Sequence, residues 1–171
     1  MQYPTPEELD ALRSQLDERL SGHSVVVVGV GNSLRGDDAV GVLIAERIEG
    51  QVAATVFHAY DVPENYAVKA ANLRPGVVLL VDAADMRLPA GSVRLLVAED
   101  LPPVPGASHR PSLEMFAAFV RLECGAESYV LGVQPDMEHV DLGADMSAGV
   151  LRALDAVEGV LLDVLSDDAV A

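Results

Sequence analysis

Two aspartates follow short apolar segments of this sequence, and their positions suggest ligand binding or acid–base chemistry. Asp82 comes directly after the apolar run Val77–Val81, and Asp38 ends a glycine-containing loop that follows the apolar run Ser24–Gly29. In parallel α/β sheets, binding groups gather where the carboxyl ends of the strands open into loops. We therefore expect Asp38 and Asp82 to lie opposite each other at one edge of a sheet.

The glycine loop between residues 29 and 38 allows two other interpretations. Gly29 and Gly31 resemble the start of a dinucleotide-binding fingerprint, but the third glycine of that pattern would fall on Leu34. Two carboxylates, Asp37 and Asp38, would also compete with a phosphate for the helix N-terminus, which disfavours nucleotide binding. Asp37 can serve as the N-cap of a helix that starts near residue 39, so we take Asp38 as the candidate ligand.

Histidines and the single cysteine offer weaker candidates. His109 lies in a loop just before a predicted helix, and a histidine in such a loop is more often a surface residue than a ligand. His139 lies among Asp136, Glu138 and Asp141, which could be a second metal site or simply a solvated acidic loop. Cys124 has no basic neighbour in the sequence to activate its thiol. Two carboxylates and one imidazole would suit a divalent ion such as nickel or zinc.

Hydrophobic periodicity predicts the elements that position these residues. Leu9, Leu12, Leu16 and Leu20 form the apolar stripe of a helix that Thr5 caps, and Gly22 ends it. The predicted helices cover residues 6–20, 39–48, 63–73, 112–123 (with Ser112 as N-cap) and 147–165, and the predicted strands cover 24–29, 52–59, 77–81, 92–97 and 128–133. Only about ten residues separate the third strand from the fourth, which is too short for a crossover helix. We therefore expect the fourth strand to run antiparallel to the third, in one three-layer α/β/α domain.

Composition limits the classes of partner. The chain has 171 residues, 50% of them hydrophobic, with a formal net charge of −16, and this surface would repel nucleic acid and anionic lipid. No apolar stretch approaches the roughly 20 residues that span a bilayer. An acidic N-terminus without an apolar run and a single cysteine both suit the cytoplasm, where we expect the protein to be.

Separate blocks of the sequence, in the order of the family, resemble the hydrogenase-maturation endopeptidases. Gly31-Asn-Ser-Leu-Arg-Gly-Asp-Asp-Ala-Val-Gly41 is similar to the opening signature of that family, Leu79-Leu-Val-Asp-Ala-Ala-Asp85 with Pro89-Ala-Gly91 to its second block, and Ser108-His109 to its Thr/Ser-His block. Val62-Pro-Glu-Asn65 and Leu131-Gly-Val-Gln-Pro-Asp136 resemble the branch that matures the large subunit of hydrogenase 3. The resemblance covers roughly residues 24 to 165. His58-Ala-Tyr60 stands where the family usually has Asp-Gly-Gly.

The resemblance implies a fold, a reaction and a site. The fold would be a three-layer α/β/α domain with a mixed, mostly parallel five-stranded sheet, covering residues 23–171 after an N-terminal helical extension of residues 1–22. The protein would remove a C-terminal extension from a nickel-loaded [NiFe]-hydrogenase large-subunit precursor. The metal-contacting and catalytic positions of the family fall on Asp38, Asp82 and His109. The resemblance implies that the nickel is carried by the precursor. Three ligands from separate segments form an incomplete shell, so we expect no tightly bound metal in the isolated protein.

Other functions stay open on the sequence alone. A non-enzymatic nickel-binding chaperone could use the same three residues, and a protease of the same fold could act on another metalloprotein precursor. We expect a monomer, with no nucleic-acid or membrane partner.

Overall fold

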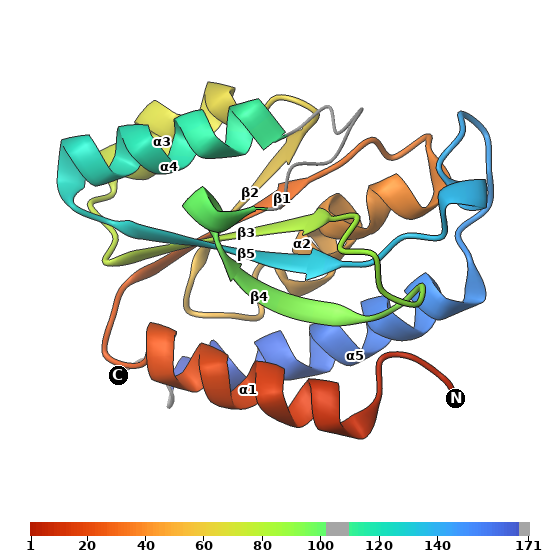
Figure 1. The fold of residues 1–171 in the computed structure, drawn as a ribbon. Helices are drawn as coiled ribbons and strands as arrows, with labels where there is room; N and C mark the ends of the chain where they lie inside the picture. The colour runs from red at the N-terminus through yellow and green to blue at the C-terminus, as the bar shows by residue number, and fades with distance from the viewer. Residues whose placement is uncertain (102–109, 168–171) are drawn as a thin grey trace.

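The chain forms a five-stranded sheet between two layers of helices (Figure 1). The computed structural model describes residues 1–101 and 110–167. The strands are β1 (Val25–Val30), β2 (Thr55–Tyr60), β3 (Val77–Ala83), β4 (Val93–Val97) and β5 (Glu127–Val133), and the α-helices are α1 (Pro6–Leu20), α2 (Val40–Ile48), α3 (Ala67–Asn72), α4 (Arg110–Cys124) and α5 (Ala148–Val164). Short 3-10 helices cover η1 (Gly36–Ala39), η2 (Pro63–Tyr66), η3 (Ala98–Asp100) and η4 (Met137–His139). This is the fold class that the sequence and the resemblance predicted.

The strand order is β2-β1-β3-β5-β4, and only β4 is antiparallel to its neighbour. The predicted direction of the fourth strand is confirmed, but β4 pairs with β5 and not with β3. The central strands β1 and β3 are buried on both faces, as their unbroken apolar runs indicated.

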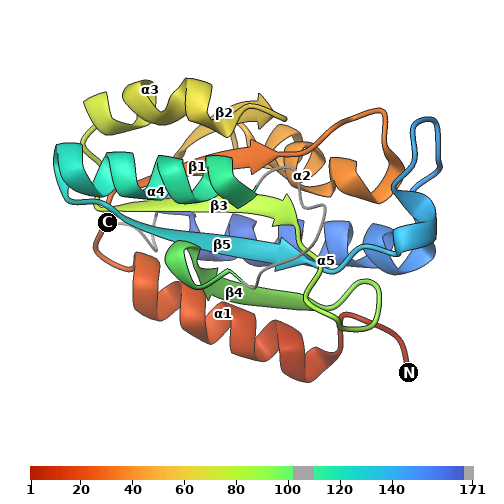
Figure 2. The ribbon, with the colours of Figure 1, turned by 45° about the horizontal axis from the view of Figure 1, so that its top comes forward.

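Two separate cores cover the faces of the sheet. One face packs against α1, α2 and α5, and the other packs against α3 and α4 (Figures 1 and 2). Helix α1 is part of the first core, because Leu12, Leu16 and Leu20 are buried in it, and α1 contacts both α5 and β4. The N-terminal helical segment therefore packs on the domain.

Several helix starts differ from the predictions. The helix predicted for residues 63–73 is divided into the 3-10 helix η2 and the α-helix α3, which begins at Ala67. Helix α4 begins at Arg110, so Ser112 lies within its first turn and is not its N-cap. Pro111 explains the earlier start, because proline fits the first turn of a helix, where a backbone N–H has no partner within the helix. Asp37 is not an N-cap either: it lies inside η1, and Ala39, which precedes α2, makes no side-chain capping bond.

Candidate active site

Asp38 lies in the turn between β1 and α2, and a single backbone bond orients its carboxylate. Its Oδ2 accepts a hydrogen bond from the backbone N–H of Asn32 at 3.0 Å. The side chain is half-buried, and no described residue donates a hydrogen bond to its Oδ1. One oxygen is therefore held by the loop while the other is available to a ligand.

Close packing of α2 on the sheet brings this turn to the ends of the two central strands. A Cβ at Gly41 would lie 2.1 Å from the carbonyl oxygen of Val81 and 2.4 Å from that of Val30. Only glycine permits this approach, since any side chain would overlap both carbonyl groups. The first turn of α2 therefore rests directly on the carboxyl ends of β1 and β3, and η1, which contains Asp38, contacts β3.

Asp82 is the second-last residue of β3, and the residue is 3% exposed. Side chains alternate between the faces of a strand, and Val78 and Leu80 lie in the core under α3 and α4. Asp82 therefore points to the α3/α4 side of the sheet. Its neighbour in β5 is Gly132, which adds no side chain beside the carboxylate.

The structure thus brings Asp38 and Asp82 to one edge of the sheet, at the carboxyl ends of adjacent parallel strands β1 and β3. Both residues lie at the sheet edge that the sequence predicted, and their roles stay predictions. The third candidate, His109, lies outside the described residues, so its role stays a prediction. Arg110, which follows it in the chain, begins α4. That helix packs against β5 and begins on the side of the sheet to which the parallel strands point (Figure 2).

Asp37 has a structural role that the sequence did not reveal. Its carboxylate is fully buried and accepts three hydrogen bonds: from the backbone N–H of Asp136 at 2.8 Å, and from the N–H and the hydroxyl of Ser147, both at 2.7 Å. Ser147 is in turn the N-cap of α5. The turn that contains Asp38 is therefore attached, through Asp37, to the segment between β5 and α5.

Two further side chains shape the loops at this edge. Asn32 accepts from the N–H of Leu34 at 2.9 Å and donates to Asp61 at 3.1 Å, which joins the β1 turn to the segment after β2. Buried Gln134 accepts from the N–H of Met86 at 2.6 Å and donates to Asp85 at 3.1 Å, which holds the loop after Asp82. An Asn after a glycine signals a turn, but nothing local to Gln134 could have predicted its distant partners.

His139 belongs to a hydrogen-bonded loop. Its Nδ1 donates to the carbonyl of Asp145 at 2.9 Å, and its Nε2 lies 4.0 Å from Asp136 Oδ2. The Asp145 carbonyl raises the pKa of His139, and the charges of Asp136, Asp37 and Glu138 add to this effect. Within residues 1–101 and 110–167, no three His, Cys, Asp or Glu side chains are grouped so that they could hold a metal ion, so the alternative of a metal site at His139 gains no support.

Cys124 and a surface groove lie outside this edge. Cys124 is the last residue of α4, and its thiol donates to the carbonyl of Val120.

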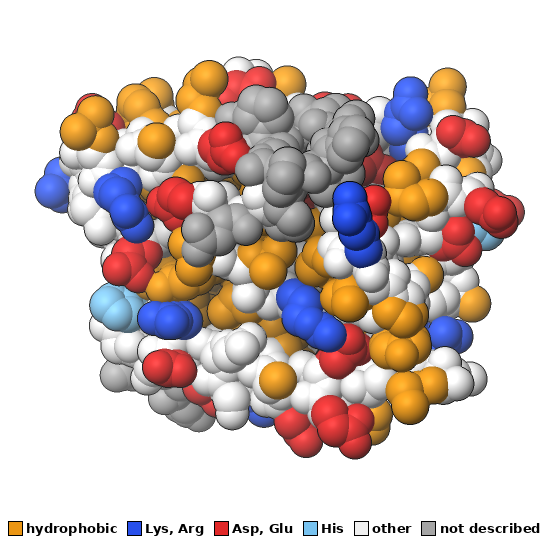
Figure 3. All heavy atoms as spheres, viewed as in Figure 1, with side chains coloured by type: hydrophobic (Ala, Val, Ile, Leu, Met, Phe, Trp, Pro, Cys, Tyr) orange, Lys and Arg blue, Asp and Glu red, His pale blue; other side chains and the backbone are white. Residues whose placement is uncertain are grey.

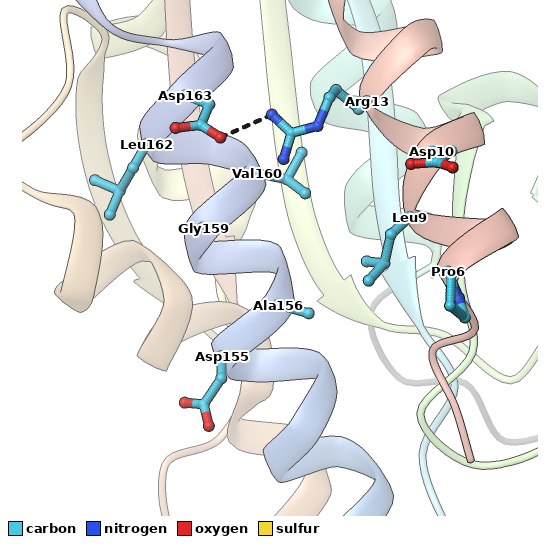
Figure 4. A pocket seen from close by; sticks show the side chains of 10 residues that line it. All are labelled: Pro6, Leu9, Asp10, Arg13, Asp155, Ala156, Gly159, Val160, Leu162 and Asp163. Carbon is cyan, nitrogen blue, oxygen red and sulfur yellow. Dashed lines mark hydrogen bonds and ion pairs between the residues drawn. The ribbon is translucent and has the colours of Figure 1, made fainter.

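A groove of about 540 Å³ separates α1 from α5, with Arg13 and Asp163 joined across it at 2.8 Å (Figure 4). The residues that line the groove all belong to α1 and α5, so the groove is not part of the acidic site. Among the described helices, none combines the length and apolar character needed to cross a membrane.

Comparisons with known proteins place the chain among proteases. No protein-family model matches it. It is 34% identical to the hydrogenase 3 maturation protease of Escherichia coli K12 over 115 residues, which are 66% of this chain and 73% of that protein. The structure superposes on the [NiFe] hydrogenase maturation protease HycI from Thermococcus kodakarensis with a TM-score of 0.77, at 25% identity and over 88% of this chain and 98% of that one. It superposes on the endopeptidase HycI of Escherichia coli with a TM-score of 0.70, at 28% identity and over 86% and 95% of the two chains. With this fold and a relative that is 34% identical, the chain belongs to the hydrogenase maturation proteases.

Proposed function

We propose that this protease removes the C-terminal extension of a nickel-loaded [NiFe]-hydrogenase large-subunit precursor, and that Asp38, Asp82 and His109 contact the nickel of that precursor. The observation that carries the proposal is the placement of Asp38 and Asp82 at one sheet edge. The metal belongs to the substrate, so the protein needs only a few ligands of its own.

The two carboxylates differ in ways that suit different tasks. Asp82 is almost completely buried at the end of a rigid central strand, so its position is fixed before the substrate arrives. Asp38 is half-buried and keeps one oxygen available at the surface. Asp38 is therefore the carboxylate that can approach the metal or accept a proton from an attacking water, which is the usual task of a general base.

His109 would add the nitrogen ligand. It directly precedes Arg110, the first residue of α4, and that helix packs on the face of the sheet to which Asp82 points. Oxygen and imidazole ligands together suit nickel. Productive docking would then require that the precursor already contains its metal, so trimming would follow metal insertion. A metal next to the scissile bond can polarise its carbonyl group.

The proposal is tested by incubating nickel-loaded and nickel-free precursor with the protein and measuring the mass of the product. The wild-type protein is expected to shorten only the nickel-loaded form. Asp38→Ala and His109→Ala are expected to fold and to leave the precursor uncut, because each loses a metal contact. Asp10→Ala is a matched control, since it removes an exposed carboxylate on the other side of the molecule.

Three results would count against the proposal. If Asp38→Ala trims at the wild-type rate, the assigned site is wrong. If the nickel-free precursor is cut equally well, nickel recognition is wrong. If the wild-type protein binds nickel-loaded precursor but leaves its mass unchanged, the chain acts on it as a chaperone would.

A further inference from the structure

Three bulky apolar side chains project from two neighbouring loops beside the acidic site. Leu34 is 65% exposed, Met137 is 56% exposed and Leu142 is 67% exposed. We call Leu34, Met137 and Leu142 the apolar lip. Single exposed apolar residues are common on protein surfaces, but a group of them marks an interaction site more often.

Backbone contacts tie the two loops of the apolar lip into one unit. The N–H of Gly143 donates to the carbonyl of Leu34 at 2.8 Å. A Cβ at Gly36 would lie 2.1 Å from the carbonyl oxygen of His139, so the loops touch backbone to backbone. The buried Asp37 carboxylate adds the bond to the N–H of Asp136. The lip is therefore a pre-formed surface, which lowers the entropy cost of binding a partner.

Acidic side chains predominate on the loop that carries Met137 and Leu142, and one exposed base, Arg35, follows Leu34 on the other loop. Asp136, Glu138, Asp141 and Asp145 lie on the same loop as Met137 and Leu142, and in the described structure no Lys or Arg forms an ion pair with any of them. Figure 3 shows hydrophobic and acidic side chains, with a few basic ones among them, on the side of the molecule where Figure 1 places the loop between β5 and α5. An acidic rim favours a basic partner and repels phosphates and anionic lipid.

The apolar lip is continuous with the site of the proposed reaction. Leu34 and Asp38 belong to the same turn, and Asp37 between them is bonded to the loop that carries the other two lip residues. A substrate protein that places its metal at Asp38 would therefore extend over the lip.

We infer that the apolar lip docks a segment of the large-subunit precursor in which bulky apolar side chains are flanked by Lys or Arg. The inference rests on the proposed function, because it takes the precursor as the partner. A second copy of this chain fits less well, since a two-fold contact would place the acidic rim against itself.

The experiment measures the dissociation constant of nickel-free precursor, which can dock without being cut. Leu34→Ser combined with Leu142→Ser is expected to raise this constant about tenfold or more, as loss of central apolar anchors does in other interfaces. Leu122→Ser is the matched control, because Leu122 is 83% exposed on α4, away from the lip loops, and the constant should not change. Circular dichroism confirms that each variant is folded.

A salt series tests the acidic rim. Raising the ionic strength from about 0.05 to 0.3 M shortens the screening length and should weaken binding of the wild-type protein. Glu138→Gln with Asp141→Asn should weaken binding at low salt and reduce the salt dependence.

The inference is overturned if the double leucine variant binds as tightly as Leu122→Ser, if binding does not depend on salt, or if the wild-type protein binds neither form of the precursor. Failure of the proposed function looks different: the wild-type protein and Leu122→Ser would bind precursor, the lip variant would not, and no protein would trim the nickel-loaded form.

Discussion

Replacing the buried Asp37 tests whether one carboxylate holds the turn of Asp38 in place. In the Asp37→Ala variant, the backbone N–H groups of Asp136 and Ser147 lose their acceptors at 2.8 and 2.7 Å. The Ser147 hydroxyl also loses its acceptor, but it can rotate to another one. Water cannot replace the lost oxygens easily, because Asp37 is fully buried.

The expected loss of stability follows from these bonds. A buried donor left without a partner costs about 1 to 3 kcal/mol, so two backbone N–H groups together give a loss of about 4 kcal/mol. For a domain with a urea m-value of about 2 kcal/mol per molar, the unfolding midpoint would fall by about 2 M. Asp38→Ala should cost only about 1 kcal/mol, because Asp38 is half-buried and accepts a single N–H.

Equilibrium unfolding in urea, followed by circular dichroism, measures both variants. Asp37→Asn keeps one acceptor oxygen, and it replaces Asp37→Ala in this measurement if Asp37→Ala does not fold. In a double-mutant cycle with Ser147→Ala, the coupling energy should be about 1 to 2 kcal/mol. If Asp37→Ala lost no more stability than Asp38→Ala, the carboxylate would not be the tie that its contacts indicate.

Two further predictions concern α1 and the loop of His139. Leu16→Ala should lower the free energy of unfolding by about 2 to 5 kcal/mol, because Leu16 is fully buried in the core that α1 shares with α5. If urea titration gave a loss below about 1 kcal/mol, α1 would add little to the stability of the domain. NMR titration of the imidazole should give His139 a pKa above its ordinary value of 6.5, and Asp136→Asn should lower it. Because the pKa of His139 is raised in the folded protein, its protonation contributes its full stabilisation below pH 6.5. This stabilisation is lost as the pH rises through the pKa of the folded protein. A measured pKa at or below 6.5 would contradict the Asp145 contact.

Most of the fold could be predicted from local sequence patterns. The unbroken apolar run of β3 indicated a strand buried on both faces, and the leucine spacing in residues 6–20 indicated α1 with Thr5 as its N-cap. The short link after β3 indicated that β4 reverses direction. The neighbour of β4 could not be predicted, because strand order depends on which faces pack together.

The sequence by itself determined which residues are the candidates for the chemistry: Asp38 after the glycine turn and Asp82 at the end of an apolar run, because these patterns are local. Tertiary structure alone decided what lies beside them. Asp37 read as a helix cap, but its partners Asp136 and Ser147 are about a hundred residues away, and no local pattern encodes that contact. The apolar lip likewise exists only because folding brings Leu34 next to a loop that follows β5. Hydrogen bonds and packing between distant segments depend on the completed sheet and its two cores, so they arise only when the chain folds.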